Sequence, residues 1–347
     1  MDTIVLRGGP EARGRQQGSA LRDRIIALWE RYQEYVYPRL GADDVERVLG
    51  NMIAFLERRF PETVRELEGV ARGAGLGFET IAKLNFGSAI WTTLLSRRAP
   101  GAGCSCVAFA DTPDGAVIGK NTDLGPEPEC YYALKIVTPE NGTPYLGYGE
   151  VGGPWVEAAV NAEGLCIGQA SSTIQAGQDG CGMPILHSAY LAMQHASTTR
   201  QAVEYLAAID HAGKGINLMI ADRAGDVVAL ERAHDRQVVR KPRDGVLYFT
   251  NHFISEKLRP LVVPFPMMAN SEGRLERYRA LLEDARPEHT TERIVAAISD
   301  HGGPVSPCQH GDAGMHTRYA CLLIPRRGEL RLFPGPACTA RPESYFV

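Results

Sequence analysis

The spacing of apolar residues changes near residue 100, and this change constrains the fold more than any other feature of the sequence. Before it, apolar residues such as Ile25, Trp29 and Tyr32 recur every three or four positions, which is typical of amphipathic helices. The stretch 99–103, Ala-Pro-Gly-Ala-Gly, is too rich in small and helix-breaking residues to continue a helix. After it, short apolar runs separated by Gly, Asn and Asp predict strands. The chain therefore begins as a helical segment and continues as a strand-rich one.

The predicted elements come in groups. The spacing predicts helices over 25–36, 45–56, 61–70 and 78–84, then strands over 107–110, 116–119, 131–137, 144–148, 155–160 and 165–171. Two helices (184–195, 199–209), four strands (217–221, 227–232, 237–239, 246–250), two helices (272–283, 291–298) and two strands (319–325, 329–333) follow. Because the strands are grouped and do not alternate singly with helices, we expect an α+β fold with two antiparallel sheets covered by helices.

Charge and hydropathy exclude several classes of partner. The chain has 37 Lys and Arg against 41 Asp and Glu, so it lacks the basic surface that grips nucleic acid or an acidic membrane. Its least polar stretches are too short to span a bilayer, and Met1–Gly18 lacks the apolar core of a signal peptide. We expect a cytoplasmic protein that binds a small molecule or peptide.

Two stretches resemble cofactor-binding motifs, but the sequence around each does not fit such a site. Residues 147–152 match the G-x-G-x-x-G fingerprint, but the pattern after them predicts strand, turn and strand instead of the helix that would hold a pyrophosphate. The glycine-rich start, with Gly8, Gly9, Gly14 and Gly18, lacks the lysine of a phosphate-binding loop. We therefore expect no cofactor.

A third candidate is the stretch 300–316, which has the composition of a metal site. His301, Cys308, His310 and His316 could serve as ligands, but their spacing matches no standard zinc pattern. We expect a polar loop that lines a pocket, without a metal. A metal-dependent hydrolase that uses these four residues stays open as an alternative.

Cys104 is the most interesting of the 8 cysteines because it lies where the helical segment meets the first strand. A cysteine that enters a strand is usually a core thiol. Here, however, Asp123, Asn251 and Arg318 also lie at the ends of predicted strands. Polar residues gathered at one end of several strands are how a sheet scaffold assembles a site.

Five short stretches follow one another along the chain: Gly103-Cys104 before a strand, Asn121-Thr122-Asp123, Asn161-Ala162-Glu163-Gly164, Thr250-Asn251-His252 and Thr317-Arg318. Together they resemble the acyl-coenzyme A:6-aminopenicillanate (isopenicillin N) acyltransferase family of N-terminal-nucleophile hydrolases. The likeness covers most of the chain, from Gly9-Pro10-Glu11 onward.

The resemblance implies a four-layer αββα sandwich and a precursor that cuts itself between Gly103 and Cys104. Residues 1–103 would become the smaller, helical chain and residues 104–347 the catalytic chain, together forming one domain. Cleavage would free the α-amino group of Cys104, whose reference pKa of about 7.7–8.0 is close to the thiol's value of about 8.5. The residue would then carry its own general base, and no catalytic histidine is needed.

The resemblance also implies roles for the strand-end residues. Asp123 would hold the α-amino group or thiol, Asn251 would donate to the oxyanion, and Arg318 would orient and polarise the nucleophile. Substrate contacts are expected from Lys120, Trp155, Gln169, Ser171, His252 and Thr317.

Departures from the family narrow the expected substrate. The penicillin-making members have Thr-Thr after the nucleophile, where this chain has Ser105-Cys106, so penicillin synthesis is not expected. Lys120 favours hydrolysis of a linear amide. The expected partners are a small-molecule amide or acyl-coenzyme A and the protein's own cleaved segment, with a homo-oligomer left open. The rival interpretation is a binding protein on the same fold that never cuts.

Overall fold

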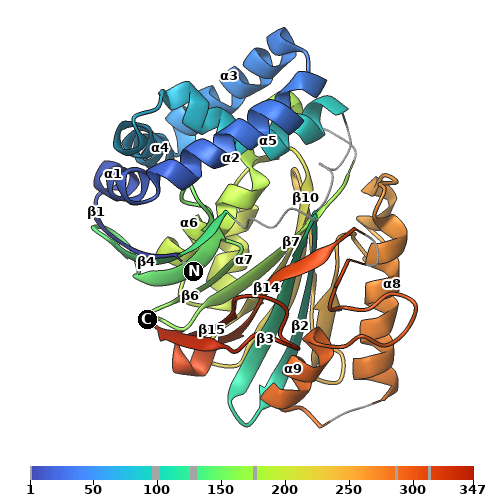
Figure 1. Cartoon of the computed structure of the whole chain (residues 1–347). Coiled ribbons are helices and arrows are strands. Elements are labelled where there is room, and N and C mark those ends of the chain that lie inside the picture. Colours follow the sequence, from blue (N-terminus) through green and yellow to red (C-terminus); the bar gives the residue numbers. More distant parts are fainter. Residues whose placement is uncertain (1, 96–101, 126–130, 175–177, 286–287, 312–313) are drawn as a thin grey trace.

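Two large sheets lie face to face between two layers of helices (Figure 1). The computed structural model describes residues 2–95, 102–125, 131–174, 178–285, 288–311 and 314–347. The sheets have eight and six strands, in the orders β1-β4-β5-β6-β7-β10-β11-β12 and β13-β2-β3-β14-β15-β16. This is the four-layer αββα sandwich that the resemblance implied. One correction concerns strand direction: β1 pairs with β4 in parallel, so the larger sheet is mixed and not wholly antiparallel.

The strands of the larger sheet are Asp2–Gly8 (β1), Tyr132–Pro139 (β4), Tyr145–Glu150 (β5), Ala158–Asn161 (β6), Cys166–Ser172 (β7), Gly215–Ala221 (β10), Val227–Ala233 (β11) and Arg236–Arg240 (β12). Those of the smaller sheet are Ala102–Thr112 (β2), Gly115–Leu124 (β3), Val246–Phe249 (β13), His316–Ile324 (β14), Glu329–Phe333 (β15) and Glu343–Phe346 (β16). A two-stranded sheet joins Met183–Pro184 (β8) to His211–Ala212 (β9).

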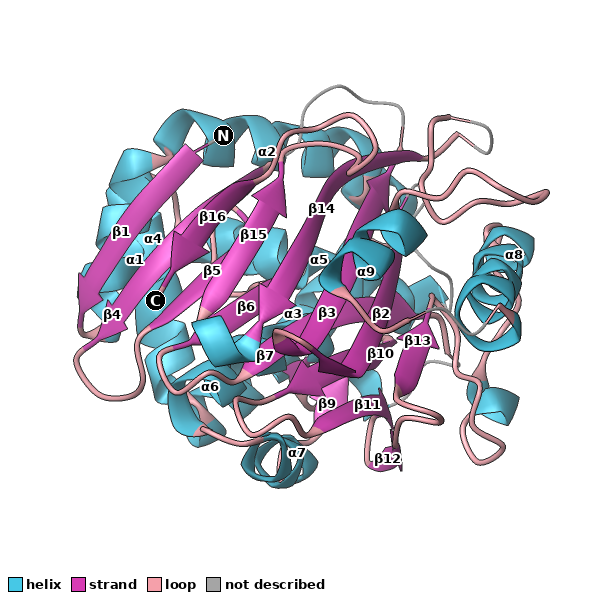
Figure 2. Cartoon of the chain, turned by 90° about the horizontal axis from the view of Figure 1, so that it is seen from below, coloured by secondary structure: helices cyan, strands magenta, loops and turns pink. Residues whose placement is uncertain are grey.

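The helices are Pro10–Ala20 (α1), Arg22–Tyr35 (α2), Ala42–Arg59 (α3), Pro61–Ala74 (α4), Phe78–Leu95 (α5), Ser188–His195 (α6), Thr199–Ala207 (α7), Met268–Arg279 (α8) and Thr291–Ile298 (α9). No described helix has both the length and the apolar character that crossing a bilayer requires. Figure 2 shows the sheets from below, with α9 lying against the strands β2, β3 and β14.

Three apolar clusters fill the spaces between the four layers. The largest joins α2–α7 to the outer face of the larger sheet, the second lies between the two sheets, and the third joins α8 and α9 to the smaller sheet. Alternation along a strand assigns each side chain to a layer. On β2, Cys104 and Cys106 belong to the cluster between the sheets, whereas Val107 and Phe109 belong to the cluster under α8 and α9.

The glycines at the start of the chain serve helix packing. A Cβ on Gly14 would lie 2.0 Å from the Glu66 carbonyl oxygen, and one on Gly69 would lie 2.3 Å from the Glu11 carbonyl oxygen. Gly18 and Gly73 extend the same contact one turn further. The backbones of α1 and α4 therefore touch, at a separation that only glycine permits. A buried ion pair between Arg13 and Glu66, 2.6 Å long, spans the same two helices.

Most predicted elements are present, and two of them, α9 and β15, have the predicted bounds. The start of α9 is set by Thr290, whose side chain accepts a hydrogen bond from the Arg293 amide. Two elements at the N-terminus are not in the prediction: β1 and α1 precede the helices that the apolar spacing indicated. The reason is physical, because α1 packs through glycine and so lacks an apolar stripe.

Candidate active site

Cys104 lies near the start of β2, at the layer between the two sheets, and is only 6% exposed. Its neighbours in the sheet come from β3, where it pairs with Thr122, and the next β2 residue, Ser105, pairs with Asn121. Strand β13 pairs with the other edge of β2 as far as Phe249 opposite Cys106. Beyond that pair, the chain of β13 continues into Thr250 and Asn251, which brings Asn251 beside the cysteine.

Both backbone polar groups of Cys104 are held by side chains from other elements. The Cys104 amide donates to Asn251 Oδ1 at 2.9 Å, and Arg274 Nη1 donates to the Cys104 carbonyl at 2.7 Å. Arg274 Nη2 also donates to Asn251 Oδ1, at 2.8 Å, so the three residues form a closed ring of contacts. A backbone inside a regular sheet needs no such side-chain partners, which marks Cys104 as a specially positioned residue.

Arg274 reaches the site from α8, on the outer side of the smaller sheet. It is buried, its Nε donates to Asn270 Oδ1 at 2.9 Å, and its Nη1 lies 3.8 Å from Asp123 Oδ2. Asp123 in turn accepts a 2.7 Å hydrogen bond from the Thr317 hydroxyl of β14. A buried cation and a buried carboxylate are thus fixed on the α8 side of Cys104, each with further hydrogen bonds that limit the cost of burial.

On the other side of the strand the thiol faces a second buried network. Cys104 Sγ lies 4.0 Å from Thr122 Oγ1, which is hydrogen-bonded to Lys120 Nζ and lies 2.7 Å from Glu157 Oε2. Lys120 Nζ itself is 3.3 Å from Glu157 Oε2. Tyr132 and Tyr319 complete the carboxylate's shell, donating at 2.8 and 2.7 Å.

The charges of this second network are mutually stabilising. Burial by itself would lower the pKa of Lys120, but the negative partners Cys104 and Glu157 outweigh it and raise that pKa. Burial opposes ionisation of Glu157, yet Lys120 and the three hydroxyl donors hold the pKa of this carboxyl below its ordinary value. Lys120 is therefore a cation and Glu157 an anion at neutral pH, close to a thiol that would gain from a positive neighbour.

Gly103 continues β2 in a regular extended conformation, opposite Asp123. Its lack of a side chain matters for space, because a Cβ would lie 3.0 Å from Met315 Cε and 3.4 Å from Asp123 Oδ2. The residue pairs as an ordinary strand residue. Glycine at this position therefore leaves room for the Met315 and Asp123 side chains beside the Gly103–Cys104 peptide.

Of the four predicted catalytic residues, the structure brings three together. Cys104, Asn251 and Asp123 are joined through Arg274. Arg318 lies at an irregularity of β14, between Thr317 and Tyr319, and its Nη2 donates to the Gly125 carbonyl at 2.6 Å. The guanidinium in contact with Cys104 is that of Arg274.

The residues expected to touch substrate have different surroundings. Ser171 and His252 flank Asn251: the Ser171 carbonyl accepts from Asn251 Nδ2 at 3.0 Å, and His252 Nδ1 lies 2.8 Å from the Ser271 hydroxyl. Thr317 contacts Asp123. Lys120, Trp155 and Gln169 are buried, with Gln169 Nε2 donating to the Val156 carbonyl at 2.6 Å. These three therefore have internal partners of their own.

Sequence reasoning missed Arg274 and Glu157, although each leaves a signal. Glu157 is the only charged residue in the strand pattern 155–160, where a carboxylate needs a buried partner. On α8 the buried residues Asn270, Ser271, Arg274 and Tyr278 share one helix face, and all are polar or amphipathic. A helix that buries such a face must offer it to polar groups.

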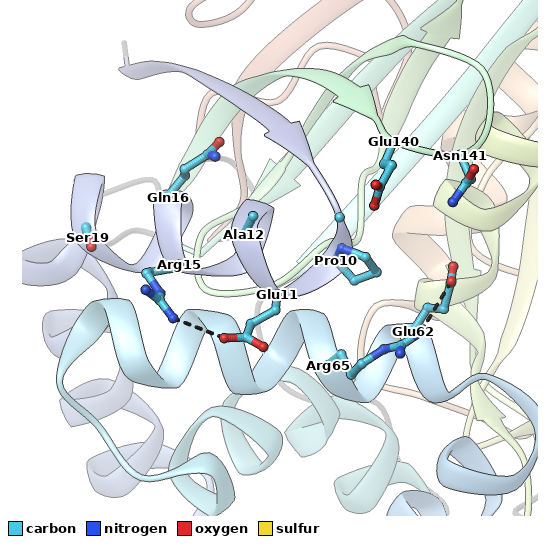
Figure 3. A pocket seen from close by; sticks show the side chains of 11 residues that line it. Pro10, Glu11, Ala12, Arg15, Gln16, Ser19, Glu62, Arg65, Glu140 and Asn141 are labelled. Carbon is cyan, nitrogen blue, oxygen red and sulfur yellow. Dashed lines mark hydrogen bonds and ion pairs between the residues drawn. The ribbon is translucent and has the colours of Figure 1, made fainter.

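A broad hollow of about 880 Å³ lies elsewhere, between α1, α4 and the turn after β4 (Figure 3). Four of its charged side chains form exposed ion pairs, Arg15 with Glu11 and Arg65 with Glu62. Neither Cys104 nor any residue in contact with it lines this hollow. We therefore assign the site by its chemistry at Cys104 and not by the size of this surface groove.

Comparison with protein families identifies the family of the chain. The sequence profile of the acyl-coenzyme A:6-aminopenicillanic acid acyl-transferase family matches residues 110–328. The chain belongs to this family. Among curated protein sequences, none matches this acyltransferase-family protein.

Three solved structures align with most of the chain at low identity. A mutant of the conjugated bile acid hydrolase from Clostridium perfringens aligns with a TM-score of 0.46 and 12% identity over 70% of this chain and 97% of its own. The Caenorhabditis elegans N-acylethanolamine-hydrolyzing acid amidase ortholog gives 0.46 and 12% over 70% and 100%. Penicillin V acylase from Agrobacterium tumefaciens gives 0.44 and 14% over 70% and 84%.

Proposed function

We propose that the protein is an N-terminal-nucleophile enzyme that cuts its own chain between Gly103 and Cys104 and then uses Cys104 as nucleophile. Its substrate would be a linear amide or an acyl thioester, and the acyl group would pass to water or to an amine. The main observation behind the proposal is that Asn251 and Arg274 form hydrogen bonds with the backbone amide and carbonyl of Cys104. A site that holds the amide of its nucleophile is suited to an enzyme in which that nitrogen becomes functional.

Self-cleavage would begin with attack of the Cys104 sulfur on the Gly103 carbonyl carbon. The Gly103–Cys104 carbon–nitrogen bond breaks, the nitrogen takes the thiol's proton, and the acyl chain is then held as a thioester on sulfur. Water hydrolyses this thioester, which leaves a carboxylate on Gly103 and restores the thiol. The support is steric, because the glycine carries no side chain that could obstruct attack on its carbonyl.

The mature enzyme would use the freed α-amino group as its base. With a reference pKa of about 7.7–8.0, that amine can accept the thiol proton at neutral pH. Asn251 Oδ1, which binds this nitrogen in the uncut chain, would keep it in place. His252 is a poor alternative base, because burial and the nearby Arg274 and Arg240 lower its pKa to about 4.

The oxyanion of the tetrahedral intermediate would be stabilised by Asn251. Its Nδ2 carries two N–H groups, and the Ser171 carbonyl accepts one of them in the uncut chain. Arg274 would take the role of orienting cation that the sequence suggested for Arg318. Asp123 would fix Arg274, Ser171 and His252 would lie nearest the substrate, and Lys120 would act on the thiol through Thr122.

The two products of cleavage would stay together. Segment 1–103 supplies β1, which pairs along its whole length with β4 of the catalytic segment. Its helices α2–α5 share one apolar cluster with strands of the larger sheet. Separation would expose that cluster to water, so we expect both pieces to remain in one folded domain.

The test is the intact mass of the purified, denatured protein beside that of Cys104→Ala. Two fragments, one ending at Gly103 and one starting at Cys104, absent from the variant, would support the proposal. A Cys181→Ser variant, which alters an exposed cysteine, should cleave like the wild type. One uncut chain in the wild type, with no acyl transfer from amide or acyl-coenzyme A donors, would contradict the proposal and favour a binding protein.

A further inference from the structure

Four side chains of types that bind metal ions come together outside the candidate active site. His301, Cys308 and His310 come from the segment between α9 and β14, and Cys338 comes from the turn between β15 and β16. Their donor atoms all lie within 4.8 Å of one another. His316, which the sequence suggested as a fourth ligand, instead pairs through its backbone with His310, and Cys338 takes its place.

Four of the six separations between the donor atoms fit a tetrahedron around one ion, and the two between His301 and the sulfurs lie within 4.8 Å. Cys308 Sγ lies 3.7 Å from Cys338 Sγ, and His310 Nε2 lies 3.3 and 3.4 Å from these sulfurs and 3.1 Å from His301 Nε2. Tetrahedral zinc, with Zn–S near 2.3 Å and Zn–N near 2.0–2.1 Å, places sulfur pairs about 3.8 Å apart, mixed pairs about 3.5 Å and nitrogen pairs about 3.3 Å. All four observed separations fall within about 0.3 Å of these values.

Hydrogen bonds alone do not explain why the four donor atoms lie so close together. His310 Nε2 is within bonding distance of three groups, namely Cys308, Cys338 and His301. A ring nitrogen has either one N–H or one lone pair, so it can satisfy one of these partners well. An ion at the centre would satisfy all four donors at once.

We propose that His301, Cys308, His310 and Cys338 bind one structural Zn²⁺. Two thiolates and two imidazoles are a donor set that zinc prefers, and each thiol loses a proton to the solvent on binding. Four protein ligands close the coordination sphere and leave no position for a substrate, so the ion is structural and not catalytic. A hollow of about 350 Å³, lined by the four ligands with Ser306 and Thr339, gives the ion a way in.

The site would act on the active centre through Gln309, the residue between two of its ligands. The Gln309 amide donates to the Thr317 hydroxyl at 2.9 Å, which donates to Asp123. Gln309 Oε1 accepts from Asn270, which holds Arg274. Zinc would therefore pin the loop that positions both Asp123 and Arg274, while touching neither.

The first measurement is the zinc content of the full-length protein, purified without chelators and dialysed, beside Cys338→Ser. We expect one zinc per chain in the wild type and in Cys181→Ser, which changes another exposed cysteine, and a loss of bound zinc in Cys338→Ser. Adding ZnCl₂ to stripped wild type should raise its Tm, and the same addition should leave the Tm of Cys338→Ser unchanged. If Cys338→Ser does not fold, His301→Ala, which alters an exposed ligand, serves in its place.

A second measurement identifies the ligands. Co²⁺ bound in place of zinc should give the intense visible absorption of a tetrahedral site with thiolate ligands, and Cys338→Ser should lose it. Protein that binds no zinc after refilling, or a Cys308–Cys338 disulfide that persists in zinc-saturated samples, would overturn the proposal. None of these readouts depends on catalysis, so the outcome is independent of the function proposed above.

Discussion

The contact between α1 and α4 and the surroundings of Cys104 are both places where distant segments meet closely, but they are built in opposite ways. The helices meet because side chains are missing: four glycines at intervals of four residues let two backbones touch. The site is built from side chains that are present, drawn from β2, β3, β13, β14 and α8, each satisfied by another. The first arrangement should be sensitive to added atoms, and the second to removed ones.

The largest effect should come from removing an amide of the site. Asn251→Ala should lower acyl-transfer activity by about two to three orders of magnitude, because loss of one oxyanion donor costs roughly 3 kcal/mol in other enzymes. Asn51→Ala, which removes an amide from α3, should leave activity unchanged. Steady-state kinetics of the cleaved proteins would check this, and more than a tenth of the activity remaining in Asn251→Ala would contradict the assigned role.

The next effect tests the charged network under the thiol. Glu157→Gln leaves the buried Lys120 cation without its carboxylate, and breaking such a pair costs about 3–5 kcal/mol of unfolding free energy. Urea titrations would measure it. The double variant Lys120→Met/Glu157→Gln should recover much of the loss, because it leaves no uncompensated charge.

A surface ion pair provides the matched control for this network. Glu276 and Arg279 on α8 are 64% and 48% exposed. Glu276→Gln should leave the urea midpoint nearly unchanged, since solvent screens exposed pairs. Equal losses from Glu157→Gln and Glu276→Gln would mean that the buried network contributes no more than a surface contact.

The helix contact should respond to one added methyl group. Gly69→Ala would place a Cβ 2.3 Å from the Glu11 carbonyl, so the helices must separate, and overpacking of this kind costs about 1–3 kcal/mol. Gly50→Ala on α3 meets nothing within 4 Å, and there the better helix propensity should stabilise by about 0.5–1 kcal/mol. Opposite signs of the two changes in urea midpoint are expected, and equal signs would refute the close contact.

The difference between packing through apolar side chains and packing through glycine also explains which helices and strands could be predicted from the sequence. A helix with one apolar face, such as α3, is predictable because burial on that face imposes a period. A strand buried along its whole length, such as β10, is predictable as a short apolar run. Helix α1 was missed because its packing face is glycine. Strand β16, four residues long and largely exposed at a sheet edge, carries too few apolar residues to show a period.

Some residues of the candidate site could likewise be predicted from the sequence, and others could not. Cys104, Asp123 and Asn251 could be proposed from the sequence because each lies near the end of a predicted strand, in a stretch that resembles the family. Arg274 was not, since no rule of local sequence links the middle of a helix to a strand 170 residues away. The approach of Cys338 to Cys308 could not be predicted for the same reason. The two cysteines are 30 residues apart, and they meet only because β15 brings the chain back to the loop.

The smallest effect concerns pH and two of the buried histidines, His252 and His187. Burial, with Arg274 and Arg240, lowers the pKa of His252 to about 4, and burial, with Lys135, lowers that of His187 to about 3. Both values lie below the 6.5 of an unperturbed histidine, so below pH 6.5 the unfolded chain binds protons that the folded chain does not. Their contribution to stability is complete above pH 6.5 and is lost as the pH falls toward these values. Urea midpoints at pH 7 and pH 5 should therefore differ less in His252→Asn than in the wild type, and an unchanged difference would show that His252 is protonated in the folded protein.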